Sequence, residues 1–173
     1  MSAKENYTYF WGGPFSNFHT VFFTDVEGIS YSCTEQYYVA KKALFFNDTF
    51  RYTQIMRESD PKKQKKHGRG VVNFNEATWY GELSEENPAK KYMFEANYYK
   101  YTQNDKLKKL LLGTVGTELV EASPYDKIWG IGQRADEFGA SHKRFWRGKN
   151  WLGEVLTKVR DTIIEEENKK FLF

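Results

Sequence analysis

Ser32-Cys-Thr-Glu-Gln-Tyr-Tyr-Val-Ala-Lys-Lys-Ala-Leu-Phe-Phe46 is the segment around which we expect the rest of this chain to fold. The Ser and Thr at its start, followed by apolar residues at helical spacing, predict a helix. Glu35 and Lys42 lie two helical turns apart, so they fall within about 20° of each other on one face, with Tyr38 and Val39 between them. Because helical side chains lean toward the N-terminus, Lys42 reaches back toward Glu35. This face is either an ion pair over the core or one side of an active site.

Both charged residues have a structural alternative. Ser32-Cys-Thr-Glu35 fits a capping box, in which Ser32 caps the helix and Glu35 accepts from the backbone of Ser32. Lys42 shares its face with apolar residues, and a lysine in that position commonly extends its amine to water. If Lys42 is buried instead, its pKa falls from about 10.4, and a neutral amine becomes available as a base or a Schiff-base nucleophile.

The composition is that of a soluble globular protein with many aromatic residues. The chain has 173 residues with 18% Phe, Trp and Tyr, more than a core requires, which favours a site that stacks planar ligands. The net charge of +3 permits an anionic partner. The single cysteine, Cys33, excludes an intrachain disulfide, and His19, His67 and His142 lack ligand spacing, so we expect no metal and no cofactor.

Nothing in the sequence indicates export or membrane insertion. The first ten residues lack the apolar run of a signal peptide, and no run of about 18 apolar residues occurs. We therefore expect a cytoplasmic protein, with entry into the nucleus not excluded, that has no membrane partner and no obligate protein partner.

The remaining pattern predicts a mainly α, multihelical single domain over residues 1–173, with a core at about 7–166 and a small antiparallel β element near the N-terminus. Residues 7–11 are expected to be extended, and Gly28 is expected to turn a hairpin between 20–23 and 29–31. Short extended segments are expected at 118–121 and 127–132. Further helices are expected at 49–58, from Pro61 to a stop at Gly68, and at 88–102, 106–112 and 151–167.

Two further segments carry residues suited to chemistry. In Ser123-Pro-Tyr-Asp126 the aspartate fits an Asx turn, but Trp129 follows three residues later and offers a large stacking ring beside Gly130, where a ligand can approach the backbone closely. The run of Lys62, Lys63, Lys65, Lys66, His67 and Arg69 is commonly a solvated face. Its functional interpretation is phosphate capture, with Arg69 the best placed, because its guanidinium matches phosphate geometry.

These segments together resemble the NADAR family, which includes riboflavin-intermediate N-glycosidases. The resemblance rests on Ser16-Asn-Phe18, Thr34-Glu-Gln-Tyr-Tyr-Val-Ala-Lys-Lys42, Gly68-Arg69, Lys100-Tyr-Thr-Gln-Asn104, Glu121-Ala-Ser-Pro-Tyr-Asp-Lys-Ile-Trp-Gly-Ile-Gly132, Asn150-Trp-Leu-Gly153 and Arg160. It covers residues 10 to about 164 in the family's motif order. Gln36 and His67 depart from the usual pattern, and Gln36 could alter substrate preference.

The resemblance implies a mainly helical enzyme that hydrolyses the bond between ribose and a base. It implies catalysis by Glu35, Lys42 and Asp126, with Trp129 at the substrate. Neutral Lys42 would attack the anomeric carbon and hold the opened sugar as an imine, and a carboxylate would stabilise charge or activate water. The residues assigned to substrate binding are Asn17, Phe18, Tyr38, Arg69, Trp79, Trp129 and Gly130.

Three interpretations of the function stay open. The favoured substrate is ADP-ribose on guanine, in a nucleotide or in nucleic acid such as DNA, because the basic residues at 62–69 suit a polyanion. The second is a ribosylated small molecule, a phosphorylated intermediate of riboflavin synthesis. The third, from another class, is a module that binds ADP-ribose or NAD without turnover.

Overall fold

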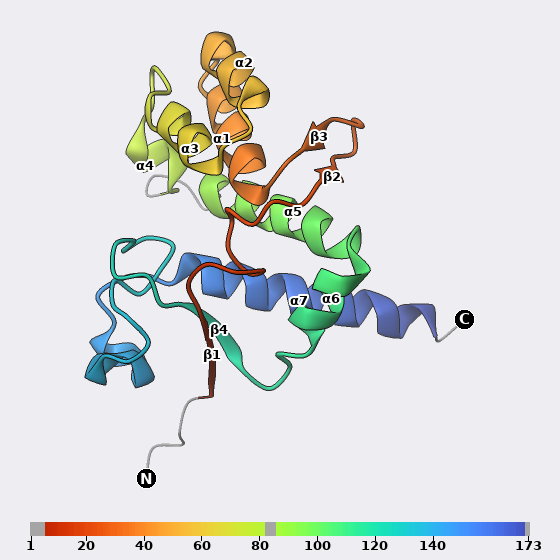
Figure 1. Ribbon diagram of the computed structural model, residues 1–173, viewed down its shortest axis with the longest axis vertical. Helices are drawn as coiled ribbons and strands as arrows, with labels where there is room; N and C mark the ends of the chain where they lie inside the picture. The colour runs from red at the N-terminus through yellow and green to blue at the C-terminus, as the bar shows by residue number, and fades with distance from the viewer. Residues whose placement is uncertain (1–5, 82–85, 172–173) are drawn as a thin grey trace. The chain divides into compact units, whose positions relative to one another are not determined.

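A computed structural model describes residues 6–81 and 86–171 of the protein, and its mainly helical architecture confirms the expected fold class (Figure 1). The chain forms two compact units. The helical unit is residues 17–103, and the terminal unit combines residues 6–16 with 104–171. The expected single domain over 1–173 stays a prediction, and each unit is described in turn.

In the helical unit, α1 (Thr34–Phe45) is the central element. It packs against α2 (Thr49–Arg57), α3 (Pro61–Arg69) and α5 (Pro88–Thr102), as Figure 1 shows. The caps are local and were predictable: the Asp48 side chain accepts from the Arg51 backbone at the start of α2, and Asp60 does the same for Lys62 at the start of α3. The short helix α4 (Glu76–Trp79) follows α3 and precedes α5 along the chain. Large buried side chains fill this unit's core: Tyr31, Tyr37, Ile55, Trp79, Met93 and Tyr101.

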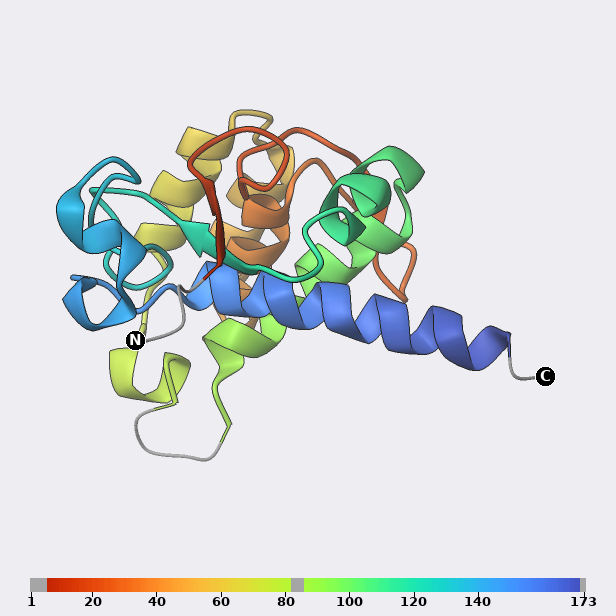
Figure 2. The same ribbon diagram turned by 90° about the horizontal axis from the view of Figure 1, so that it is seen from below.

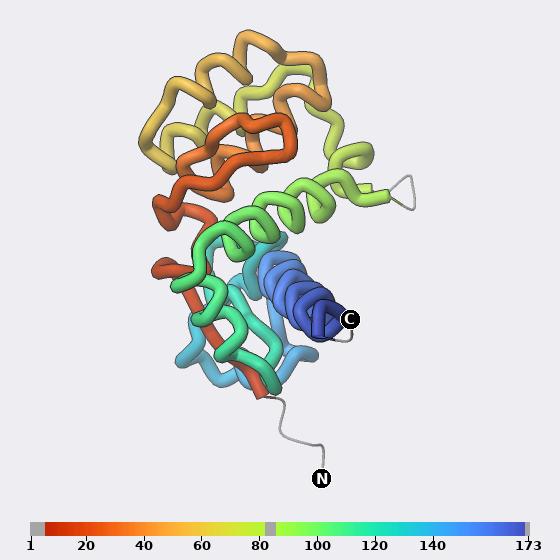
Figure 3. Tube along the Cα trace, turned by 90° about the vertical axis from the view of Figure 1, so that its right-hand side faces the viewer, coloured from red at the N-terminus to blue at the C-terminus, as the bar shows by residue number. Residues whose placement is uncertain are grey.

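The predicted hairpin is present in the same unit. Strands β2 (Phe23–Thr24) and β3 (Ser30–Tyr31) pair antiparallel, with Phe23 opposite Tyr31. The Asp25 carboxylate organises the turn, because its Oδ1 accepts the backbone N–H groups of both Glu27 and Ile29. Gly28 has the positive φ of 79° that the turn requires. Figure 3 shows the hairpin beside α5, which contacts β2.

The terminal unit is built on a pair of strands whose pairing was not predicted from the sequence. Strands β1 (Tyr7–Phe10) and β4 (Glu118–Glu121) are both extended as expected, and they pair in parallel with Tyr7 opposite Glu118 (Figure 2). The helix α6 (Asp105–Leu112) precedes β4 in the chain, and the long helix α7 (Trp151–Lys170) packs on β4. In the described residues, no helix, α7 included, combines the length and apolarity needed to cross a membrane.

The motif Asn150-Trp-Leu-Gly153 attaches α7 to β4. The Asn150 side chain bonds the strand as a neighbouring strand would: its Oδ1 accepts from the Glu121 N–H at 3.0 Å, and its Nδ2 donates to the Leu119 carbonyl at 3.1 Å. A Cβ at Gly153 would lie 2.0 Å from the Leu119 carbonyl oxygen, so only glycine permits this approach. These motif residues therefore have a structural role.

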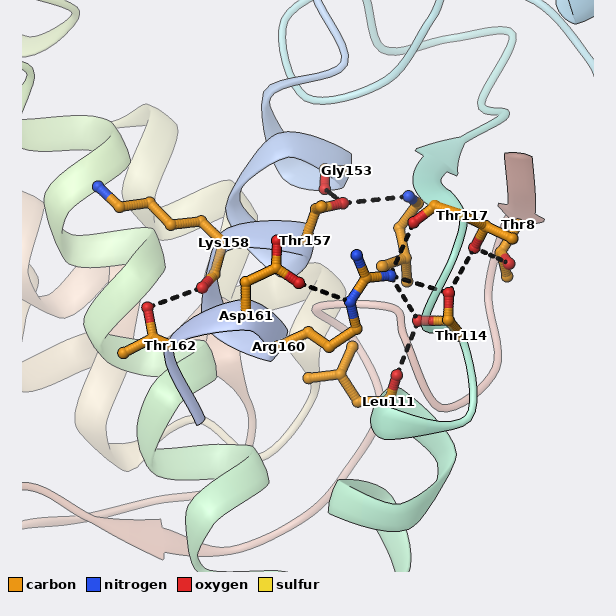
Figure 4. A network of polar contacts seen from close by, with 11 residues as sticks. Thr8, Leu111, Thr114, Thr117, Gly153, Thr157, Lys158, Arg160, Asp161 and Thr162 are labelled. Atoms are coloured by element: carbon orange, nitrogen blue, oxygen red, sulfur yellow. Dashed lines mark hydrogen bonds and ion pairs between the residues drawn. The ribbon is translucent and has the colours of Figure 1, made fainter. Parts of the chain in front are cut away.

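Arg160 fixes the connection between α6 and β4 (Figure 4). Its Nη1 donates to the Thr114 carbonyl at 2.9 Å and to the Thr117 carbonyl at 2.7 Å, and its Nε pairs with Asp161. Thr117 in turn bonds Thr8 of β1 at 2.6 Å. Because the Arg160 side chain is nearly buried, this set of bonds holds both strands against α7.

Candidate functional site

The cap of α1 differs from the expected capping box, and the difference bears on Glu35. The N-cap is Cys33, whose Sγ accepts the Gln36 N–H, and Gln36 Oε1 accepts the Ser32 N–H at 2.7 Å. The return contact of the cap is therefore made by Gln36 and not by Glu35. The capping-box interpretation of Ser32 and Glu35 was wrong by one residue, because the buried Cys33 thiol replaces the hydroxyl. Glu35 lies in the first turn with 6% of its surface exposed.

Gln36 is also a structural tie within the helical unit. Its Nε2 donates to the carbonyl of Ile55 at 3.1 Å, near the end of α2, and it is almost fully buried. One of the two positions that depart from the usual pattern of the family that the sequence resembles is therefore occupied by a side chain that joins α1 to α2.

Asn17 lies against the start of α1. Its carbonyl accepts the Glu35 N–H at 3.1 Å, and its Oδ1 accepts from the Thr34 hydroxyl at 3.0 Å. One of the backbone donors that a helix N-terminus leaves unpaired is thereby satisfied. Asn17 thus positions the backbone that carries Glu35. Its assignment to substrate binding stays a prediction.

The Lys42 amine is held inside the helical unit and does not extend freely to water. Its Nζ donates to the Gly68 carbonyl at 3.0 Å and lies 3.9 Å from the centre of the Phe74 ring. The amine thus contacts both a carbonyl oxygen and an aromatic ring. The side chain is partly buried, which is the second of the two alternatives considered for this lysine.

Burial lowers the pKa of Lys42 to about 8, with Glu35 raising it and Arg69 lowering it further. The influence of Glu35 shows that the two residues are electrostatic neighbours, as their spacing predicted. An ordinary lysine is neutral in about one molecule in a thousand at pH 7.4, whereas a pKa of about 8 makes this fraction about one in five. Lys42 is therefore equipped to act as a nucleophile or a base.

Gly68 has a different role from the helix stop that was expected. Helix α3 continues to Arg69 and its C-cap is Gly70. A Cβ at Gly68 would lie 2.3 Å from Cγ1 of Val39, so the glycine permits α1 and α3 to approach each other. That approach places the Gly68 carbonyl against Lys42. The C-cap prediction failed because glycine was selected by packing between helices.

Trp79, Tyr38 and the neighbouring rings form the aromatic part of this unit. The Trp79 indole N–H donates to the Tyr38 hydroxyl at 2.8 Å, and Trp79 stacks on Tyr92 with ring centres 5.8 Å apart. Trp79 is fully buried. It therefore orients Tyr38, and the expected contact of either ring with substrate stays a prediction.

Phe18 lies near the basic helix α3, and Arg69 is the last residue of that helix. The Lys65 amine lies 5.5 Å from the centre of the Phe18 ring. Arg69 is exposed in the last turn of α3, which also contains Lys66 and His67. Arg69 is thus close enough to Lys42 to influence its pKa and accessible enough to meet an anion.

A second lysine of this unit, Lys100, was missed as a titrating group. Burial lowers its pKa to about 7, and nearby Cys33 opposes this effect. Its side chain is fully buried in α5, whereas Lys42 is only partly buried. Accessibility therefore favours Lys42 as the reacting amine. The sequence signal for Lys100 was its position among Tyr98, Tyr99 and Tyr101.

In the terminal unit, Asp126 forms the Asx turn that was one of its two interpretations. Its Oδ1 accepts the backbone N–H groups of Ile128 at 2.9 Å and Trp129 at 2.8 Å, and Ser123 Oγ accepts the Asp126 N–H. Among the described residues Oδ2 makes no hydrogen bond. One oxygen thus shapes the turn, and the other remains able to bind water or substrate.

Trp129 and Gly130 follow in the same turn. Trp129 is nearly buried and packs edge-on to Trp151, with ring centres 5.9 Å apart. A Cβ at Gly130 would lie 2.9 Å from the carbonyl oxygens of both Glu121 and Asp126, so the close approach at this glycine is made by the chain's own backbone. Substrate binding by these two residues stays a prediction. Across the described residues, no three His, Cys, Asp or Glu side chains are arranged to hold a metal ion.

The sequence matches the NADAR domain over residues 7–164. N-glycosidase R617 of Acanthamoeba polyphaga mimivirus is 42% identical over 139 residues, which cover 78% of this chain and 76% of that protein. Protein irg-1 of Caenorhabditis elegans is 39% identical over 137 residues, covering 78% of this chain and 62% of that longer protein. The NMR structure of the E. coli protein YbiA is similar with a TM-score of 0.74 at 26% identity, covering 95% of this chain and 89% of that one.

Proposed function

The chain belongs to the NADAR family and is a hydrolase of N-glycosyl bonds, and from this premise we propose that it removes ADP-ribose from guanine in nucleic acid. The observation that carries the proposal is the Lys42 amine, held between the Gly68 carbonyl and the Phe74 ring with a pKa of about 8. A neutral amine beside a carboxylate is suited to displacing a base from an anomeric carbon.

The reaction balances without a cofactor. The neutral Lys42 nitrogen forms a bond to the anomeric carbon as the bond from that carbon to guanine breaks, and guanine leaves with the bonding electrons and takes a proton. The ring then opens to an imine with its ring oxygen protonated. Water adds to the imine carbon, the bond to Lys42 breaks, and ADP-ribose is released with the amine regenerated. Glu35 and Asp126 are the carboxylates proposed to move these protons.

The choice of ADP-ribose follows from the charge beside the amine. Helix α3 carries Lys62, Lys63, Lys65, Lys66 and Arg69, and its penultimate residue, Gly68, bonds the Lys42 amine. The exposed Arg69 guanidinium, which lies close enough to Lys42 to lower its pKa, is suited to binding a diphosphate beside the amine. Tyr38, Trp129 and Asn17 are proposed to contact the base and ribose.

Borohydride trapping tests the covalent step. With ADP-ribosylated guanosine present, reduction of the imine should leave a stable adduct on the protein, visible by mass spectrometry and mapped to Lys42. The matched control is Lys41→Ala, because Lys41 is the next residue of α1 and pairs with Asp25 at 3.4 Å. The adduct should persist in Lys41→Ala and disappear in Lys42→Ala. An adduct that survives Lys42→Ala would refute the imine.

A side-by-side substrate assay tests the rest of the proposal. The protein is offered ADP-ribosylated guanosine and a ribosylaminopyrimidine phosphate, and release of each base is followed by chromatography. We expect faster release of guanine. Preferential cleavage of the pyrimidine would assign the enzyme to riboflavin intermediates instead. ADP-ribose binding without cleavage of either substrate would contradict the proposed hydrolase.

A further inference from the structure

Two aromatic rings of the terminal unit are exposed next to the Asp126 turn. Trp11 follows β1 and is 56% exposed, and Tyr125 directly precedes Asp126 and is 84% exposed. Their ring centres lie 5.7 Å apart with the planes tilted by 55°. Large exposed rings lose the hydrophobic stabilisation that burial would supply, so a pair of them in contact suggests a binding surface.

An open groove lies along the same residues. Its volume is about 300 Å³, at the lower end of the range for small-ligand sites, and therefore suits a single base or nucleotide. Tyr9, Phe10, Trp11 and Ala122 supply its apolar lining. Its polar lining comes from Arg134 and Asp136, which pair with each other at 3.1 Å. The groove thus has an aromatic face to stack a ring and a guanidinium at its polar side.

The segment that supplies Arg134 is strongly basic. Residues 127–149 contain six Lys or Arg and two Asp or Glu, in a chain whose net charge is only +3. All six cations are exposed: Lys127, Arg134, Lys143, Arg144, Arg147 and Lys149. Exposed Phe138 and Phe145 alternate with them, and the Arg144 guanidinium lies 4.7 Å from the centre of the Phe145 ring. Figure 2 shows this segment beside the β1–β4 pair.

Cations interleaved with exposed rings are the arrangement that binds single-stranded nucleic acid. The cations attract the phosphates, and each ring stacks on a base whose face is open. A base pair in a duplex has both faces covered by its neighbours, so an exposed tryptophan gains little from it.

We propose that Trp11 and Tyr125 stack an unmodified base of a single-stranded nucleic-acid substrate, while the cations of 127–149 bind its phosphates. This inference rests on the proposed function for the identity of the modified residue. It adds that single-stranded nucleic acid is bound in preference to a duplex and to an isolated nucleoside.

Binding of an unmodified oligonucleotide tests the proposal without any cleavage. Fluorescence anisotropy of a labelled single-stranded oligothymidylate, titrated with the full chain at several salt concentrations, gives both affinity and salt dependence. Trp11→Ala and Tyr125→Ala should each weaken binding about 5- to 150-fold, the range for loss of one stacked base, and leave the salt slope unchanged. Lys149→Ala should reduce the slope of log K against log salt by about 0.7.

Matched controls separate stacking from general effects. Phe50 in α2 is 70% exposed and lies in the helical unit, so Phe50→Ala should bind as the wild type does. Trp11→Phe keeps a ring and should retain most of the affinity. Absence of oligonucleotide binding by the wild type, equal loss in Phe50→Ala, or no loss in Trp11→Ala and Tyr125→Ala would each overturn the proposal.

Cleavage then distinguishes this proposal from the proposed function. Trp11→Ala should raise KM for an oligonucleotide that contains ADP-ribosylguanine and leave kcat/KM for ADP-ribosylated guanosine unchanged. A wild-type protein that binds the unmodified oligonucleotide through Trp11 but cleaves neither substrate would sink the proposed function and leave this inference standing. Equal losses on both substrates would overturn the proposed site for an unmodified base.

Discussion

Replacing either charged neighbour of Lys42 should shift the pKa of its amine, and the two replacements should act in opposite directions. Burial is the main cause of the lowered pKa, Glu35 raises it and Arg69 lowers it. Glu35→Gln removes a negative charge that favours the ammonium form, so the pKa should fall below about 8. Arg69→Gln removes a repulsive positive charge, so the pKa should rise.

The expected size of the shift in Glu35→Gln follows from Coulomb's law. Two residues that are seven positions apart on a helix are separated by about 10 Å along the axis, and leaning side chains reduce this distance to about 8 Å. At that separation, an effective dielectric constant of about 20 to 80 gives about 0.5–2 kcal/mol, or a change of about 0.4 to 1.5 in the pKa. Salt screens such a pair, so the shifts should be larger at low ionic strength.

Two assays read this pKa independently. NMR titration of the protein with ¹³C-dimethylated lysines follows the amine directly, and Lys42→Arg assigns its signal. The second assay is the pH dependence of kcat, which should rise with pH and level off above about 8, because only the neutral amine attacks. In Arg69→Gln the rising limb should move to higher pH. In Glu35→Gln the pKa of Lys42 is read by NMR, because the loss of a proton-transferring carboxylate should leave too little activity for a pH profile of kcat.

The reasoning fails if the amine titrates near its ordinary value of about 10.4 in the wild type. It also fails if both variants shift the pKa in the same direction, because burial alone would then control it. A shift in Arg69→Gln alone would mean that Glu35 is not the electrostatic neighbour of Lys42 that the structure indicates.

Three further predictions address other residues. Asp126→Asn keeps the Oδ1 acceptor of the turn and removes the charge, so it should lower kcat and unfold in urea as the wild type does. Asp126→Ala removes the acceptor too and should also lose about 1–3 kcal/mol of stability. Equal activity in wild type and Asp126→Asn would assign Asp126 to the turn alone. Gly68→Ala should destabilise by about 1–3 kcal/mol, because its Cβ would meet Val39, whereas Gly113→Ala, with neighbours at 3.4 Å, should be nearly neutral in the same urea titration. Lys100 has a pKa of about 7, so above that pH the unfolded chain binds more protons than the folded chain. The free energy of unfolding should therefore rise by about 2 kcal/mol between pH 7 and 9, and this rise should shrink in Lys100→Met. The same pH dependence in wild type and Lys100→Met would show that Lys100 does not titrate in this range.

The parts of this structure that were predictable from sequence are those specified by residues close together in the chain. The helix that begins at Pro61 and the turn at Gly28 each depend on a few neighbouring residues, and each is present. The shared face of Glu35 and Lys42 follows from helix geometry alone. These predictions needed no knowledge of what packs where.

The features that were missed depend on residues far apart in sequence. Nothing local indicates that Tyr7 pairs with Glu118, because parallel strands need a long connection and each strand has only four residues. Gly68 was interpreted as a helix stop because its contact, Val39, belongs to another helix. Local rules describe a glycine at a helix end well, but they cannot distinguish that position from one selected by packing between helices.

The chemistry proposed for Lys42 depends on the same long-range packing. The last four carbonyls of a helix lack partners within it, and the Gly68 carbonyl belongs to this group in α3. The residue four positions on, Val72, donates its N–H to Asp48 Oδ2. The Gly68 carbonyl is therefore left to accept from Lys42 at 3.0 Å. A helix C-terminus favours a cation, which would raise the pKa of the amine. Because the pKa is nevertheless lowered to about 8, burial outweighs this attraction, and the close approach of α1 and α3 is what makes Lys42 a candidate nucleophile.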